Sequence, residues 1–154
     1  MNKKKFISVA KDVINLEIKA LQKLKNNINN SFYEAMNQIA KCQSKVILCG
    51  VGKSGLIASK IAATLSSVGT PSFSLSASDS SHGDLGMISK KDILILISYS
   101  GQTNELKNII QYANRNKILL IGIVSKKDSP LIEGKSWLST SFDSLPSKLT
   151  WIIS

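Results

Sequence analysis

The residues best suited to chemistry in this chain of 154 residues lie in three short polar segments. The first, SYSGQTNE at residues 98–105, places the hydroxyls of Ser98, Ser100 and Thr103 around the turn residue Gly101. Neutral hydroxyls together with the amides at the start of a helix suit a phosphate monoester, which they bind reversibly. One helix cap needs a single hydroxyl, so three at this spacing favour a ligand over a hydroxyl-rich cap.

The second segment is GVGKSG at residues 50–55, which contains Gly50, Gly52 and Gly55. It follows an apolar run typical of a strand and opens a helical pattern. Glycines in this position let the backbone approach a ligand closely while amide groups point at an anion. The alternative is a tight turn from strand to helix in which the glycines serve packing alone.

Two nucleotide-binding loops contain similar glycines, but neither fits this segment. A dinucleotide site would have an acidic residue near the end of the second strand, where Ser74 and Ser76 stand. A triphosphate-binding loop would have a glycine five residues before Gly52, where the chain has Ile47. What remains is a general anion site at a helix start.

The third segment, SASDSSHGDLGM at residues 76–87, contains His82, the single histidine of the chain. A lone histidine in a loop is more often a hydrogen-bonding surface residue than a catalyst. Its neighbours favour chemistry, because Lys53 and Glu105 in the other two segments complete an acid/base set able to move a proton between adjacent sugar carbons.

The elements around these segments follow from hydrophobic periodicity. Helical spacing between residues 6 and 42, with a polar break, predicts two consecutive helices. Short β-rich runs then alternate with helical stripes, and they predict strands at 45–50, 72–76, 92–98, 117–124 and 136–141. Alternating strands and helices indicate an α/β fold, a three-layer α-β-α sandwich around a mostly parallel five-stranded sheet. The segments at 50–55 and 98–105 both follow strands, and in such sheets ligands bind at the carboxyl ends.

Length and composition predict a single domain. It divides into N-terminal helices at 1–42, an α/β core at 45–141 and a short tail at 142–154. The apolar runs are far shorter than the roughly 20 residues of a membrane-spanning helix, and the basic N-terminus lacks a cleavage site, so we expect a cytoplasmic protein without a membrane partner. Cys42 and Cys49 have no ligand spacing and are expected to be reduced thiols, and no metal or other cofactor is predicted.

The formal charge of +10 is not organised as a nucleic-acid surface. The 20 basic residues include one arginine, Arg115, and the others are lysines spread along the chain. We therefore expect no nucleic-acid partner. A lysine-rich surface is compatible with small phosphorylated anions.

Taken together, three stretches resemble the arabinose-5-phosphate isomerase branch of the SIS (sugar isomerase) family. They are GVGKSGLIASKIAATLSSVGTPS at 50–72, HGDLGMI at 82–88 and ISYSGQTNE at 97–105, and the resemblance covers roughly residues 10–130. It implies a flavodoxin-like domain that interconverts D-ribulose 5-phosphate and D-arabinose 5-phosphate through an enediol, for the Kdo sugar of lipopolysaccharide. A homo-oligomer, dimer or tetramer, is also implied.

The resemblance assigns roles to individual residues. It places Lys53, His82 and Glu105 at the reacting end of the sugar. The phosphate-binding positions that it implies are Gly52, Ser54, Ser98, Ser100, Gly101 and Thr103.

The C-terminal stretch departs from the family pattern. Family members continue past the fifth strand into a loop with a glutamate, a helix and a second catalytic histidine, and many add paired CBS domains. Here residues 141–154 read SFDSLPSKLTWIIS, with no glutamate after Glu133 and no histidine other than His82. Two functions therefore stay open: an isomerase, completed if necessary by another chain, or a truncated domain that binds a phosphosugar without converting it.

Overall fold

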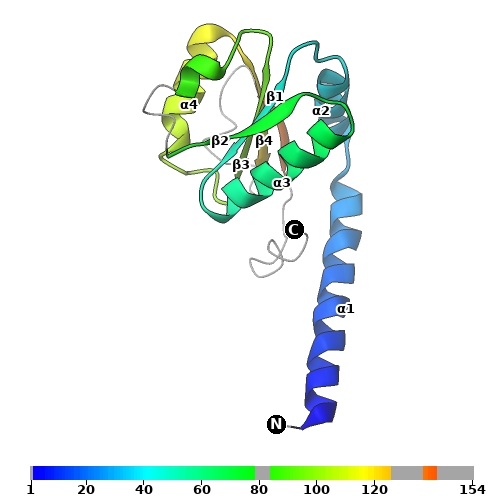
Figure 1. Ribbon diagram of the computed structural model, residues 1–154. Helices are drawn as coiled ribbons and strands as arrows, with labels where there is room; N and C mark the ends of the chain where they lie inside the picture. The colour runs from blue at the N-terminus through cyan, green and yellow to red at the C-terminus, as the bar shows by residue number, and fades with distance from the viewer. Residues whose placement is uncertain (1, 79–83, 126–136, 142–154) are drawn as a thin grey trace.

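Strands and helices alternate between residues 46 and 124 in the computed structural model, which describes residues 2–78, 84–125 and 137–141 (Figure 1). The helices are α1 (Lys3–Asn27), α2 (Asn30–Ala40), α3 (Lys53–Ser67) and α4 (Leu106–Asn116), with a short 3-10 helix, η2 (Asp84–Met87). The strands are β1 (Val46–Gly50), β2 (Ser72–Ser76), β3 (Ile93–Ser98), β4 (Leu119–Val124) and β5 (Trp137–Ser141). This order confirms the α/β class, and the expected tail at 142–154 lies outside the described residues.

The strands form one five-stranded sheet in the order β2-β1-β3-β4-β5. All four neighbouring pairs run parallel, with Gly50 opposite both Ser76 and Ile97. Each predicted strand is present, and its bounds agree with the prediction to within two residues. The order is the flavodoxin-like one: β2 lies on one side of β1, and the chain then crosses back to form β3 on the other side of β1.

Both faces of the sheet are covered, which explains the continuous apolar runs in β1 and β3. In β1, Ile47 and Cys49 join a core cluster with α4, while Val46 and Leu48 join a second cluster on the opposite face. The second cluster includes Ala35 from α2 and buried alanines of α3. Small residues on α3 let that helix lie close to the sheet.

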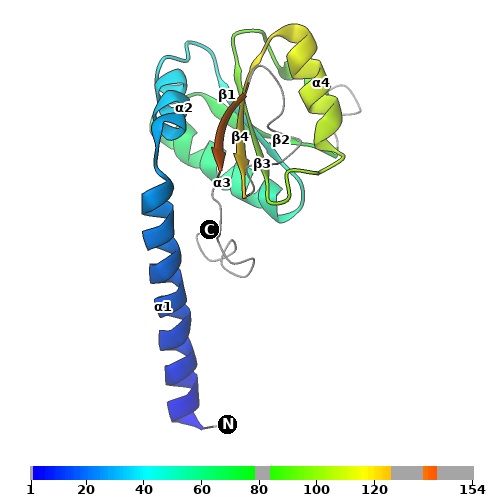
Figure 2. The ribbon, with the colours of Figure 1, turned by 180° about the vertical axis from the view of Figure 1, so that it is seen from behind.

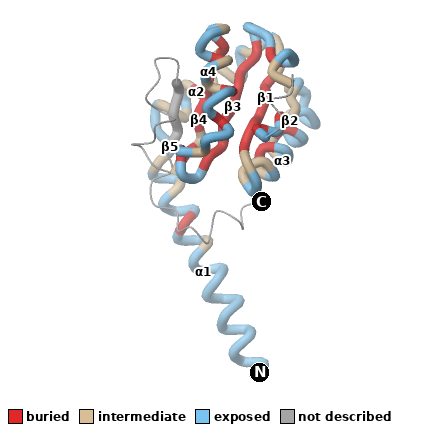
Figure 3. The backbone as a smooth tube through the Cα atoms, turned by 90° about the vertical axis from the view of Figure 1, so that its left-hand side faces the viewer, coloured by how far each residue is buried: buried red, intermediate tan, exposed pale blue. Residues whose placement is uncertain are grey.

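Helix α1 projects away from the sheet, as Figures 1 and 2 show. It ends at the predicted polar break, where the Asn29 side chain accepts hydrogen bonds from the amides of Ser31 and Phe32 and so begins α2. Most of α1 is exposed in Figure 3, and of its residues only Ala20 is buried. Within the described ranges, no helix is long and apolar enough to cross a membrane.

A buried carboxylate ties the starts of β1 and β3 together. Asp92 is 1% exposed, and its two oxygens accept hydrogen bonds from the Ser44 hydroxyl at 2.6 Å and from the Ser89 amide at 2.7 Å. The Lys45 ammonium lies 3.1 Å away. Burial acts to raise the pKa of Asp92, but these hydrogen bonds together outweigh it and lower the pKa to about 2.

The pKa of Asp92 makes the stability of the fold depend on pH. The folded value of about 2 lies below the ordinary 3.8, so the carboxylate stabilises the protein above about pH 4, and this contribution is lost as the pH falls toward 2. We expect Asp92→Asn to lower the free energy of unfolding at neutral pH by about 2 kcal/mol and to flatten the dependence in that window. Urea unfolding at several pH values measures both effects. Asp12→Asn, on exposed α1, is the control. If the free energy of unfolding of Asp92→Asn fell between about pH 4 and 2 as steeply as that of the wild type, Asp92 would not be the source of the pH dependence.

Candidate functional site

The sheet order brings two of the three polar segments together. Strands β1 and β3 are neighbours, and their last residues, Gly50 and Ser98, lie at the same edge because Gly50 pairs with Ile97. From this edge the chain turns toward β2 after β1 and toward β4 after β3. The two turns therefore flank the switch point of the sheet, where open parallel sheets bind ligands.

The β1–α3 turn depends on two different properties of glycine. Gly52 has φ +57°, a conformation that side chains rarely adopt, and it precedes the first residue of α3 without a side-chain cap. At Gly50, an added Cβ would lie 2.6 Å from the carbonyl carbon of Ser54, and at Gly55 it would lie 3.0 Å from the oxygen of Gly50. Close packing of strand against helix thus requires glycine at positions 50 and 55, whereas Gly52 shapes the turn itself.

The β3–α4 turn holds its hydroxyls by hydrogen bonds within the segment. The buried Ser98 hydroxyl lies 2.8 Å from the Thr103 hydroxyl and accepts the Gly101 amide at 3.0 Å. The Ser100 hydroxyl accepts the Gln102 amide at 3.2 Å. These contacts position the three predicted hydroxyls at the start of α4, where the helix dipole favours an anion.

The predicted acid/base residues are only partly described. Lys53 is the first residue of α3 and Glu105 immediately precedes α4, and both are exposed at the switch-point edge. Glu105 also has a structural role available, because a carboxylate near a helix start is stabilised by the helix dipole. His82 lies outside the described residues, so its place in the site stays a prediction.

Cys49 is close to the site but is not a nucleophile. It is fully buried in β1, one residue before Gly50. Burial raises the pKa of its thiol to about 12, against a small opposing effect of a backbone hydrogen bond to Gly50. The thiol therefore stays protonated at neutral pH and serves packing, in line with the sequence expectation.

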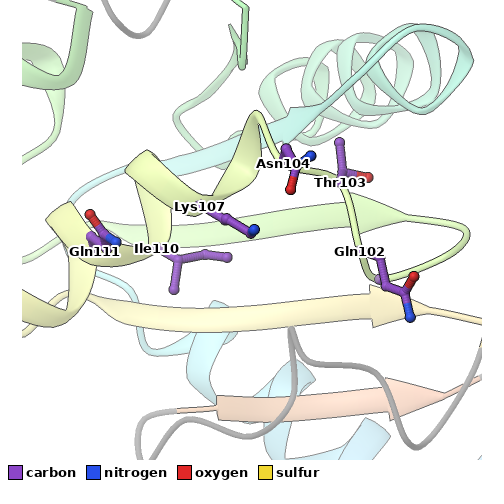
Figure 4. A pocket seen from close by; sticks show the side chains of 7 residues that line it. Gln102, Thr103, Asn104, Lys107, Ile110 and Gln111 are labelled. Atoms are coloured by element: carbon purple, nitrogen blue, oxygen red, sulfur yellow. The ribbon is translucent and has the colours of Figure 1, made fainter.

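A cavity of about 580 Å³ lies beside the β3–α4 turn. Its described lining is Gly101, Gln102, Thr103, Asn104, Lys107, Ile110 and Gln111 (Figure 4). Sequence reasoning missed Lys107 and Gln111, although their spacing of four residues places them on one helix face. Among the described residues, no group of three histidine, cysteine or acidic side chains could hold a metal ion.

Comparison with known proteins identifies relatives of this chain. Residues 38–140 match the SIS domain family. The chain is 44% identical over 126 residues to arabinose 5-phosphate isomerase KdsD of Yersinia pestis, covering 82% of this chain and 38% of that protein. It is 40% identical over 125 residues to arabinose 5-phosphate isomerase GutQ of Escherichia coli K12, covering 81% and 39%. The chain thus spans less than half the length of these relatives.

A solved structure matches nearly all of the chain. The protein c3406 of E. coli CFT073, solved in complex with arabinose 5-phosphate, superimposes with a TM-score of 0.88 and 32% sequence identity. The match covers 99% of this chain and 87% of that one. The arrangement of α1, the sheet and the two turns is therefore shared with a protein whose structure holds a sugar phosphate.

The close approach of Gly50 to α3 gives a test of the site's framework. We expect Gly50→Ala to lower the free energy of unfolding by about 1–3 kcal/mol, because the added methyl group meets the backbone of Ser54 and Gly55, which cannot move independently of α3. Urea unfolding with matched variants measures the difference. Gly86→Ala is the control, since nothing lies within 4 Å of a Cβ added there. Equal stabilities of the two variants would show that the strand-to-helix contact is not tight.

Proposed function

This chain belongs to the SIS domain family, and from that premise we propose that it is a sugar-phosphate isomerase that interconverts D-ribulose 5-phosphate and D-arabinose 5-phosphate. The observation that carries the proposal is the pairing of β1 with β3, which brings the glycine-rich turn before α3 and the hydroxyl-rich turn before α4 to one edge. In this proposal the reaction takes place in the cytoplasm and supplies Kdo for lipopolysaccharide.

In this proposal the two turns have different roles, because they carry different chemical groups. The phosphate binds at the β3–α4 turn, to the hydroxyls of Ser98, Ser100 and Thr103 and to its amides, and Ser54 and Gly52 contribute from the other turn. The sugar then extends toward Lys53 and Glu105, the charged groups at the same edge.

Isomerisation moves one proton between adjacent carbons. A carboxylate takes the proton from C1 of the ketose to form an enediol and returns it to C2, while a second proton passes between the two oxygens. We propose Glu105 as the carboxylate. Lys53 stabilises the negative charge that develops on the enediol oxygen, and His82 is the proposed partner for the transfer between oxygens.

The second candidate function is binding of a phosphosugar without turnover. It is favoured by the exposure of both Lys53 and Glu105, which leaves the proposed acid/base pair open to solvent. The two candidates share the phosphate site and differ only at the reacting end.

We also propose that the chain acts as a homo-oligomer with α1 in the contact. Eight large apolar side chains of α1 are 38–55% exposed: Phe6, Ile7, Val9, Val13, Ile14, Leu16, Ile18 and Leu21. Their exposed surface is on the order of 700 Å², close to the roughly 800 Å² that each partner contributes to a standard interface. A second copy of the chain is the occupant that this area and the exposed apolar face suit best.

Turnover and binding can be separated by one substitution. We expect the wild-type protein to convert ribulose 5-phosphate in a coupled assay and Glu105→Gln to lose about 10²–10⁴-fold of that rate, because the amide cannot accept the carbon-bound proton. The melting temperature should rise with millimolar arabinose 5-phosphate in both proteins. Glu34→Gln, which removes a carboxylate from α2, is the matched control. A melting shift without wild-type turnover would support the binding function, and no shift would contradict both.

The proposed oligomer is tested on the apolar face of α1. Sedimentation equilibrium should give a mass at least twice 16.7 kDa for the wild type. Ile14→Lys should shift the protein to the monomer, because a buried unpaired charge opposes association. Asn15→Lys adds the same charge to an exposed polar position next to it and should leave the mass unchanged. A monomeric wild type would refute this proposal.

A further inference from the structure

The cavity beside the β3–α4 turn continues the proposed phosphate site along helix α4. Gly101 and Thr103 belong both to its lining and to the residues proposed to bind phosphate. The rest of its described wall is formed by side-chain amides, one aliphatic side chain and Lys107. Lys107 is thus the one charged residue among the described lining residues.

The hydroxyl turn by itself leaves a phosphate poorly neutralised. Its side chains are uncharged, and Ser98, Ser100 and Thr103 already have hydrogen-bond partners within the turn. A sugar phosphate carries a charge of about −1.5 to −2 at neutral pH. Lys53 is assigned to the reacting end of the sugar, so a second cation, placed at the phosphate itself, is the group that this proposal still needs.

Lys107 is placed to be that cation. It follows Thr103 by four residues, and its amide donates to the Asn104 carbonyl at 3.0 Å, a hydrogen bond that joins the first turn of α4 to the β3–α4 turn. Figure 4 shows its side chain extending from α4 toward the side on which Gln102 and Thr103 lie. Lys107 forms no ion pair with any described residue. Its charge is thus not neutralised within the described part of the chain.

The position of Glu105 separates the two charges. Glu105 caps the start of α4 and Lys107 follows it by two residues, a spacing at which side chains on a helix do not face each other. The proposed proton-transferring carboxylate and the ammonium of Lys107 therefore point in different directions from the helix start. This arrangement keeps Lys107 from pairing with Glu105 and leaves it available to an anion at Thr103.

We propose that Lys107 binds the phosphate of the substrate as its counter-charge, from the cavity side of the β3–α4 turn. The inference rests on the proposed function, since it names a residue of the same ligand site. It goes beyond the nine positions named from the sequence, none of which is Lys107. It makes Lys107 a binding residue that sets affinity for phosphorylated sugars and takes no part in proton transfer.

The test measures binding of arabinose 5-phosphate by calorimetry in the Glu105→Gln background, so that the ligand is not converted. We expect Lys107→Met to bind at least about tenfold more weakly, the loss expected for one charge-assisted hydrogen bond. Lys107→Arg should retain affinity. Lys60→Met, which removes an exposed lysine from α3, should bind like its parent.

A second readout separates charge from structure. The phosphate gains its second charge near pH 6, so affinity should rise between about pH 5 and 7 in the parent and in Lys60→Met. The rise should be reduced in Lys107→Met. Parent binding with an unchanged Lys107→Met affinity and pH profile overturns this inference alone. No binding by the parent, together with no effect of the sugar phosphate on the melting of the wild type, overturns the proposed function with it.

Discussion

The parallel pairing of β1 with β3 is the contact on which the site depends. It sets the β1–α3 turn beside the β3–α4 turn, and every residue of both strands is buried. At the other end of the same pair, Asp92 is held by Ser44 and Lys45, which precede β1. Two strands buried on both faces thus connect a buried polar cluster at their amino ends to the polar turns at their carboxyl ends. The register of this pair sets the position of one turn relative to the other.

Most of the fold follows from local signals in the sequence. The strands are short apolar runs and the helices carry apolar stripes, and each pattern is complete within one element. The signals that end a helix are equally local. Gly69, with φ +93°, follows α3, and the Thr70 amide donates to the Leu65 carbonyl at 2.9 Å. The two polar turns can be predicted because glycines and hydroxyls gather where a strand meets a helix. The general rule for parallel sheets predicts that both turns lie at the carboxyl ends of the strands, whereas their adjacency follows only from the order of the strands in the sheet.

The remaining features depend on contacts between distant residues, and no local pattern reports them. Asp92 precedes an apolar run and has the sequence appearance of an exposed strand start, yet its partner Ser44 is 48 residues away. The need for glycine at position 50 comes from the approach of α3, which the sequence does not give as a distance. Lys107 looks like any lysine of a solvated helix face until the cavity beside Thr103 is seen. The exposure of the apolar face of α1 likewise appears only when the helix is seen to project from the sheet.

The hydrogen bonds within the β3–α4 turn bear on how a phosphate would be held there. Ser98 both accepts the Gly101 amide and shares a hydrogen bond with Thr103, so a ligand that takes over the Thr103 hydroxyl leaves Ser98 still paired. The turn can therefore keep its form while one hydroxyl changes partner. Such an exchange gains only the difference between a hydrogen bond to a charged group, about 1.5–3 kcal/mol, and the ordinary one that is lost, about 0.5–1.5 kcal/mol. In a turn built this way, hydroxyls determine where the phosphate lies, and its affinity must come from helix amides and from charge.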